Sequence, residues 1–262
     1  MPAAYAVAAL WKREIVKFVR DRSRLFGALA QPFGFWLLLG LGFHGTFRMP
    51  EGTEVEIGYM EFLFPGIITL ILLFTAVFTT ISIVEERKSG FLQAVLVAPV
   101  SRTMLVLGNT LGGTTLAVVQ ALLFLLLLPV LGLPLHLISI FFVVLISTLT
   151  GLAFTALGFI IAWRMDTTRG FHAVMNLVLL PLWFLSGAAF PAEGASPMLR
   201  WVMNINPVSY AVSAIRQAIY WPDAAPITTA SLPGSLLVSG AFTVVLLAFA
   251  VMTARKPLFG EG

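Results

Sequence analysis

The sequence predicts an all-α integral membrane protein with six membrane-spanning helices in one transmembrane domain, 1–262. Hydrophobic residues make up 59% of the 262 residues and charged residues 11%, and the mean hydropathy is +0.96. A soluble domain of this size does not tolerate so apolar a composition. The chain also contains six apolar runs, each of the roughly 20 residues that a helix needs to cross the hydrocarbon core. The runs are 25–47, 60–84, 103–131, 135–163, 171–191 and 232–254.

The positions of the basic residues predict the orientation of the chain. Of the 16 lysines and arginines, all but Arg48, Arg200 and Arg216 fall in segments that are cytoplasmic if both termini lie inside. Because cytoplasmic segments carry an excess of lysine and arginine, we expect both termini inside and an even number of spans. The only ionised side chain within the six runs is Glu61, at the edge of the second. Its isolation disfavours proton or sodium antiport, which uses ionisable groups within the membrane.

The segment 3–22 predicts a helix that lies in the inner headgroup layer, ahead of the first span. At about 100° per residue, its apolar and basic residues occupy opposite arcs. The apolar arc holds Val7, Trp11, Ile15, Phe18 and Val19, and the basic arc holds Lys12, Arg13, Lys17 and Arg20. The basic side suits anionic lipid or a protein partner, and simple lipid anchoring is the alternative. We assign this interface to Trp11, Arg13, Lys17 and Arg20.

The second run, 60–84, carries an unusual mixture of hydroxyl and aromatic groups. Helical spacing places Thr75, Thr79 and Ser82 on one face, with Phe74 and Phe78 beside them. Such a surface suits a cavity for an amphipathic molecule. The alternative is that each hydroxyl bonds a backbone carbonyl one turn earlier in its own helix.

The segment 85–102 is a charged island between two apolar runs, so a soluble partner could bind the chain only here or near its ends. We expect Ser89 to cap a short helix that Pro99 terminates. Helical spacing places Phe91, Leu92, Val95 and Leu96 on one face of that helix. The helix would lie along the membrane surface and offer an apolar ridge, and an ordinary solvated loop is the alternative.

The remaining runs carry small and polar residues with packing roles. Gly108 and Gly112 have the small-xxx-small spacing of close helix packing, within one chain or between two. Asn176 is the most polar group of the fifth run and would need a partner on another helix or a substrate. In the apolar outer connection 192–231, Asn206 and Pro207 predict the start of a short helix, 207–220. We expect a re-entrant or interfacial element there, or else a surface helix packed over the bundle.

Catalytic motifs are missing from the sequence. There is no phosphate-binding Gly-x-x-x-x-Gly-Lys-Ser/Thr loop, no His-Glu-x-x-His zinc motif and no Gly-x-Ser-x-Gly nucleophile elbow. With three histidines and no cysteine, we expect no metal site, no thiol chemistry and no enzymatic activity of this chain alone.

Three motifs, in order, resemble a known family. They are Tyr59-x-x-Phe62-x-x-Pro65-Gly66 at the start of the second run, the segment 85–99 after it, and Asn206-Pro207-x-x-Tyr210 followed by Arg216. With the amino-terminal helix and six runs, they make the chain similar to the membrane (permease) subunit of a bacterial ATP-binding-cassette exporter of the type-2 permease class.

The resemblance implies a half-transporter of the bacterial inner membrane that forms a homodimer and recruits two copies of a separate cytoplasmic ATPase. The partner would bind ATP and Mg²⁺, and this chain would carry no cofactor. The cargo would be an amphipathic drug-like molecule, a lipid or a glycolipid. The family's coupling helix, which docks on the ATPase, corresponds to Glu85, Glu86, Arg87, Ser89, Gly90, Phe91, Leu92, Val95, Leu96 and Pro99. Its substrate cavity, between spans two and five, corresponds to Phe74, Thr75, Phe78, Thr79 and Asn176.

Two other classes of function are alternatives. A secondary transporter driven by an ion gradient predicts acids within the membrane or broken helices in matching halves, and the sequence has no such acid and no evident repeat. An intramembrane enzyme needs a nucleophile and a base that face each other, and Ser186 and His172 are the candidates.

Overall fold

The computed structural model describes residues 3–43, 47, 57–97, 101–192, 194–221 and 228–255, and within these ranges the chain is helical without strands. The all-α prediction is therefore confirmed for the described residues. The helices are α1 (Ala3–Arg20), α2 (Arg22–Gly42), α3 (Tyr59–Thr79), α4 (Ile81–Lys88), α5 (Phe91–Val97), α6 (Arg102–Leu125), the 3-10 helix η1 (Leu128–Leu131), α7 (Leu137–Ala162), α8 (Thr168–Phe184), α9 (Pro197–Ile205), α10 (Pro207–Ile219) and α11 (Leu232–Arg255).

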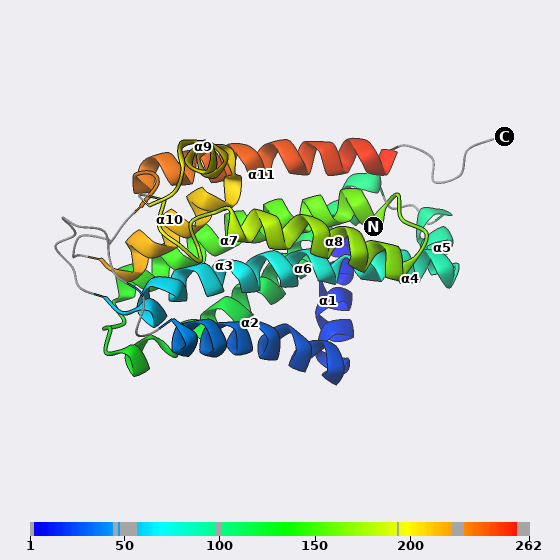
Figure 1. Cartoon of the computed structure of the whole chain (residues 1–262). Helices are drawn as coiled ribbons and strands as arrows, with labels where there is room; N and C mark the ends of the chain where they lie inside the picture. The colour runs from blue at the N-terminus through cyan, green and yellow to red at the C-terminus, as the bar shows by residue number, and fades with distance from the viewer. Residues whose placement is uncertain are drawn as a thin grey trace.

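Four segments of the described chain are long and apolar enough to cross a membrane. They are Tyr59–Lys88, Arg102–Leu131, Leu137–Ala162 and Leu232–Arg255, which coincide with four of the six predicted runs. Helices α2 and α8 cover most of the other two runs and lie along the same axis as these four (Figure 1). Six spans with both termini inside remain a prediction.

Helix α3 lies at the centre of the bundle. It packs against α2, α6, α7, α8 and α10. Of the most apolar 18-residue stretch of Tyr59–Lys88, 94% is buried. The helix stops at Thr80, where the Thr79 and Thr80 hydroxyls donate to the carbonyls of Ala76 and Val77 at 2.8 and 2.7 Å. Such back-bonding bends helices, and α4 then continues for eight residues towards α5.

Helix α1 runs across the bundle axis instead of along it, at the end that holds α4, α5 and the end of α11 (Figure 1). We call this the α1 end; α9 and α10 lie at the opposite, α9 end. A Cβ atom added at Gly108 or Gly112 of α6 would lie 2.5 Å from the Leu10 Cβ or 2.6 Å from the Glu14 Cβ. The two glycines therefore admit α1 within the same chain, which decides between the two packings that their spacing allowed.

Of two segments at the α9 end, one has the helix that the sequence predicts and the other is helical over only part of the predicted run. The helix expected at 207–220 is α10, with Pro207 in its first turn and the Asn206 side chain accepting from the Val208 N–H at 3.0 Å. Helix α10 packs against α3, α7 and α11. The fifth run, in contrast, is helical only to Phe184, because the chain turns at Gly187 with a φ of +77°.

Candidate functional site

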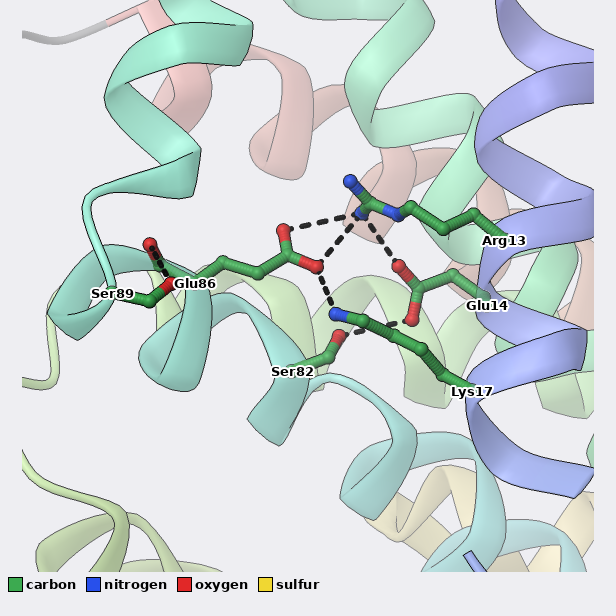
Figure 2. A network of polar contacts seen from close by, with 6 residues as sticks. All are labelled: Arg13, Glu14, Lys17, Ser82, Glu86 and Ser89. Carbon is green, nitrogen blue, oxygen red and sulfur yellow. Dashed lines mark hydrogen bonds and ion pairs between the residues drawn. The ribbon is translucent and has the colours of Figure 1, made fainter. Parts of the chain in front are cut away.

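A group of five polar side chains joins α1 to α4 at the α1 end, and we call it the α1–α4 network (Figure 2). It comprises Arg13, Glu14, Lys17, Ser82 and Glu86. Glu86 is 6% exposed and accepts from the Arg13 Nη2 at 3.1 Å and from the Lys17 ammonium. Two residues from the predicted amino-terminal interface thus bind α4 of the same chain.

Glu14 is a member of this network that sequence reasoning missed. Its side chain is 4% exposed and accepts from the Arg13 Nη2 at 2.7 Å and from the Ser82 hydroxyl at 3.0 Å. Two carboxylates therefore meet two cations, which offsets the cost of burying the acids. The available signal was a single acid within a basic helix, where exposure of the acid is the usual expectation.

We expect Glu86→Ala to lower the free energy of unfolding by about 1–3 kcal/mol, because Arg13 and Lys17 would then face each other with one acid between them. The loss is smaller than for a fully buried pair, since the two cations are 25% and 39% exposed. Thermal unfolding in detergent measures the effect. Asp166→Ala is the control, because that side chain is 88% exposed and pairs with Arg87 at 3.2 Å. Equal losses in both variants would contradict a stabilising role for the network.

The prediction that Ser89 caps the short helix of the charged segment, which is α5, is wrong. Ser89 is the C-cap residue directly after α4, and its hydroxyl donates to the Glu86 carbonyl of that helix at 3.1 Å. Gly90, with a φ of +75°, separates the two helices. A serine caps a helix from the position directly before its first residue, and Gly90 holds that position before Phe91.

The predicted apolar ridge of α5 is divided between two surroundings. Leu92 is buried in the core and Val95 is half-buried against it, whereas Phe91 is 47% exposed. The Arg13 guanidinium lies over the Phe91 ring at 5.2 Å from its centroid. A partner can therefore reach Phe91 and Val97, which is 87% exposed, but not Leu92. The Leu96 side chain and Pro99 lie outside the described residues.

Arg87 fastens α4 to the turn after α7. Its guanidinium donates to the carbonyls of Met165, Trp163 and Ala162, at 3.1 Å for Met165 and 3.4 Å for Ala162. The Ala162 and Trp163 carbonyls lie at the carboxyl end of α7, where a cation complements the helix dipole, and the Ala162 carbonyl also accepts from the Met165 N–H at 3.2 Å. Helix α4 is thus bound to α1 on one side and to the α7–α8 turn on the other.

Two residues of the predicted amino-terminal interface do not join this network. The Trp11 indole N–H donates to the Thr115 hydroxyl on α6 at 3.0 Å. Arg20, at the last position of α1, is exposed.

A cavity of about 480 Å³ lies between α2, α3 and α8 near the α1 end, and we call it the inner cavity. All five residues predicted for a substrate cavity line it: Phe74, Thr75, Phe78, Thr79 and Asn176. Glu85 from the predicted coupling segment lines it too, as do Gln31 and His172. The cavity therefore offers aromatic faces together with amide, imidazole and carboxylate groups.

The hydroxyl groups of Thr75, Thr79 and Ser82 are engaged within the protein. The Thr75 hydroxyl donates to the Gln120 amide oxygen on α6, and that of Thr79 to its own helix, as the alternative interpretation expected. Ser82 does not line the cavity, because it turns towards Glu14. Aromatic rings dominate instead: Phe78 lies 5.5 Å from Phe74 and 5.0 Å from the His172 ring.

The residue pair considered for an intramembrane enzyme does not meet. His172 lines the inner cavity, whereas the Ser186 hydroxyl is buried beyond the opposite end of α8 and donates to the Trp183 carbonyl at 2.6 Å. At a rise of about 1.5 Å per residue, the two are roughly 20 Å apart. Among the described residues, no three His, Asp or Glu side chains gather as a metal site would require.

The sequence motifs at the α9 end converge on the non-helical segment 185–190. The Asn206 amide donates to the Leu182 and Leu185 carbonyls at 2.6 and 2.8 Å, and the Tyr59 hydroxyl donates to the Ala189 carbonyl at 2.9 Å. Asn206 thus satisfies carbonyls at the end of α8, and Tyr59 satisfies one in the non-helical segment that follows it.

Arg216 adds a charged donor to the same segment. Its guanidinium is 3% exposed and donates to the carbonyls of Phe62 and Gly187 at 3.3 and 3.2 Å, above the Phe62 ring. Gly66 allows the close approach, because a Cβ there would lie 2.8 Å from the Ala188 carbonyl oxygen. Burial also raises the pKa of the nearby Tyr220 phenol, so this group stays neutral at physiological pH.

Comparison with known proteins places this geometry in context. A family model described as ABC-2 type transporter matches residues 5–220, from α1 through α10, and so includes the network and the inner cavity. Nodulation protein J of Rhizobium meliloti (strain 1021) is 27% identical over 219 residues, which cover 79% of this chain and 79% of that protein. Proteins named transport permease ycf38 are also similar. The one from Porphyra purpurea is 28% identical over 80% of this chain and 72% of its own length, and that from Cyanophora paradoxa is 26% identical over 79% and 71%.

Proposed function

Because the chain belongs to the ABC-2 type transporter family, we propose that it is the permease subunit of an ATP-driven exporter. Membership confirms the family that the sequence motifs resemble, and it makes the chain a multi-pass membrane protein of the transport permease kind. Export, the energy source and the location in a bacterial inner membrane are the proposed part.

One observation carries the proposal: an uninterrupted set of contacts links the exposed face of α5 to the inner cavity. Phe91 lies under Arg13 of the α1–α4 network, the network holds α4, and α4 continues into the cavity-lining end of α3 across Thr80. A protein that pressed on α5 would therefore displace the cavity wall. This arrangement suits a permease that receives mechanical work from a partner.

The partner that we propose is a separate cytoplasmic ATPase in two copies, which binds ATP and Mg²⁺. This chain has no phosphate-binding loop of its own, so hydrolysis would take place in the partner. We propose no cofactor and no enzymatic activity for the chain itself.

The permease would act as a homodimer with six spans per subunit and both termini inside. The basic α1 end then faces the cytoplasm, where its cations can contact anionic lipid and the partner. Helix α9, with Met198, Trp201 and Ile205 exposed, would lie at the outer membrane interface.

The inner cavity supports an amphipathic cargo, such as a drug-like molecule, a lipid or a glycolipid. Phe74 and Phe78 offer apolar surface, and Gln31 and Asn176 offer hydrogen bonds at the same site. A volume of about 480 Å³ lies within the usual range of small-molecule sites.

Co-purification tests the proposal. The chain is expressed with the ATPase encoded beside its gene, and the complex is isolated in detergent and assayed for ATP hydrolysis. We expect a stable complex that hydrolyses ATP and, in vesicles, moves cargo only when ATP is present. Uphill transport by the chain alone, driven by a pH or sodium difference, would instead establish a secondary transporter.

A further inference from the structure

A groove distinct from the inner cavity lies between α1 and α6 at the α1 end, and we call it the α1–α6 groove. Its volume is about 700 Å³, which lies within the usual range of small-molecule sites. The described residues that line it are Ala4, Val7, Ala8 and Trp11 of α1, Thr103, Met104, Leu107 and Leu111 of α6, and Ser101 directly before α6.

Both walls of the groove are apolar faces of regular helices. The α1 wall follows the i, i+3, i+4 and i+7 positions from Ala4 to Trp11, and the α6 wall follows the i, i+3 and i+7 positions from Met104 to Leu111. Leu107 and Leu111 are 37% and 40% exposed, so the described part of the chain leaves the space between the walls open. On the surface of a membrane protein, such a space meets lipid tails, which are as apolar as leucine.

The groove has a polar end and an apolar end. Helix α6 begins at the α1 end, so Ser101 and Thr103 lie at the groove's end nearest to that side of the membrane. Leu111 lies about 15 Å further along α6. Near Leu111, the Trp11 indole N–H donates to the Thr115 hydroxyl at 3.0 Å, which joins the two walls at the apolar end. A molecule with a polar head and an apolar chain matches this gradient.

A cation without a counter-ion lies at the polar end. Arg102 stands between Ser101 and Thr103 in the chain, half-buried and beside the groove, not in its lining. Its guanidinium forms no hydrogen bond or ion pair with another described residue, and its Nη1 atom is buried without a partner. An unpaired, partly buried cation costs free energy, which an anion beside it would offset.

We propose that the α1–α6 groove binds an anionic phospholipid of the cytoplasmic leaflet, with an acyl chain between the two helices and the head group against Arg102. The proposal rests on the proposed function only for the orientation that turns the α1 end towards the cytoplasm. The apolar walls select a chain, and the unpaired guanidinium selects a net negative head group. Anionic lipids give the cytoplasmic leaflet its negative surface potential, so the ligand is present where the groove opens.

A bound lipid would also support the α1–α4 network. Gly108 and Gly112, where α1 makes its close approach to α6, directly follow the lining residues Leu107 and Leu111. An acyl chain in the groove would therefore brace this contact from the side. Because α1 supplies Arg13 to the network, the lipid would help to hold α4 in place.

Native mass spectrometry of the full chain in detergent tests the site. The protein is incubated with phosphatidylglycerol or with phosphatidylcholine of the same acyl chains, and the dissociation constant of the first bound lipid is measured. Leu107→Trp and Ala8→Phe fill the groove from opposite walls, and Arg102→Gln removes the cation. The matched controls are Leu123→Trp, at a 51% exposed position of α6 outside the groove, and Arg164→Gln, at an exposed cation.

We expect the wild type to bind phosphatidylglycerol about ten-fold more tightly than phosphatidylcholine, because the net negative head group gains a charge-assisted hydrogen bond. Arg102→Gln should lose this preference. Leu107→Trp and Ala8→Phe should weaken the binding of both lipids about ten-fold or more, since the acyl chain loses its apolar contacts. Both controls should bind as the wild type does.

Equal affinity of the wild type for the two lipids overturns the proposal, as does unchanged binding in the folded groove-filling variants. A loss in Leu123→Trp as large as in Leu107→Trp would mean that the lipid binds the apolar surface in general, which also contradicts a site. Thermal unfolding identifies the variants that fold, and Arg102→Gln decides the matter if neither filling variant does. The assay contains no ATP, ATPase or cargo, so failure of the lipid site is distinguishable from failure of the proposed ATP-driven export.

Discussion

Phe91→Asp is expected to abolish co-purification of the ATPase while membrane insertion stays intact. Phe91 is the large aromatic ring that α5 exposes, and an aromatic anchor at the centre of an interface is worth about 2 kcal/mol or more, which is roughly 30-fold in affinity. The new carboxylate would lie beside the Arg13 guanidinium that now covers the ring, so the permease itself should tolerate it. Affinity capture of the complex from detergent-solubilised membranes measures the loss.

Phe91→Leu is the matched control for this experiment. It keeps an apolar side chain at the same position and should retain most of the bound ATPase. If Phe91→Asp recruits as much ATPase as the wild type, α5 is not part of the interface. An equal loss of bound ATPase in both variants would indicate that the ATPase binds the aromatic ring itself.

Gly112→Ala is expected to displace α1 from α6 and to destabilise the protein by about 1–3 kcal/mol, the usual cost of overpacking a close contact. The added Cβ would lie 2.6 Å from the Glu14 Cβ, an atom attached directly to the α1 backbone, so the helix must move as a whole. That movement would also pull Glu14 away from Ser82 and disturb the α1–α4 network. Thermal unfolding and limited proteolysis near the amino terminus report the two effects.

Gly240→Ala on α11 is the control for Gly112→Ala. A Cβ there meets no atom within 4 Å, so the same change of residue should be neutral or slightly stabilising, as alanine favours helix. Similar destabilisation at both positions would mean that lost glycine flexibility, and not the contact with α1, is responsible.

The helical part of the structure was predictable because apolar length and helix signals are local properties. The run 232–254 and the helix α11 (Leu232–Arg255) nearly coincide, and Asn206 with Pro207 marks the start of α10. Phe74 and Phe78, which helical spacing placed together, line one cavity with Asn176, which the family resemblance implied. Their role in binding a cargo stays a prediction.

The missed features depend on which neighbour a helix face meets, and periodicity does not contain this information. Leu92 and Phe91 looked equivalent on the predicted ridge, yet Leu92 packs into the core. Ser89 was expected to cap forwards, but Gly90 beside it takes the turn conformation. Glu14 became a buried network member only because Gly112, distant in sequence, lets α1 approach α6.

The break at Thr80 determines how far the tip of α4 moves when this helix tilts. Helix α4 has eight residues and is therefore about 12 Å long, with Thr80 as its fulcrum and α5 at its far tip. A tilt of about 10° around Thr80 would carry the tip through roughly 2 Å. Ile81 and Glu85 of α4 line the inner cavity, so the same tilt would move this part of the cavity wall directly, by about 1 Å at Glu85.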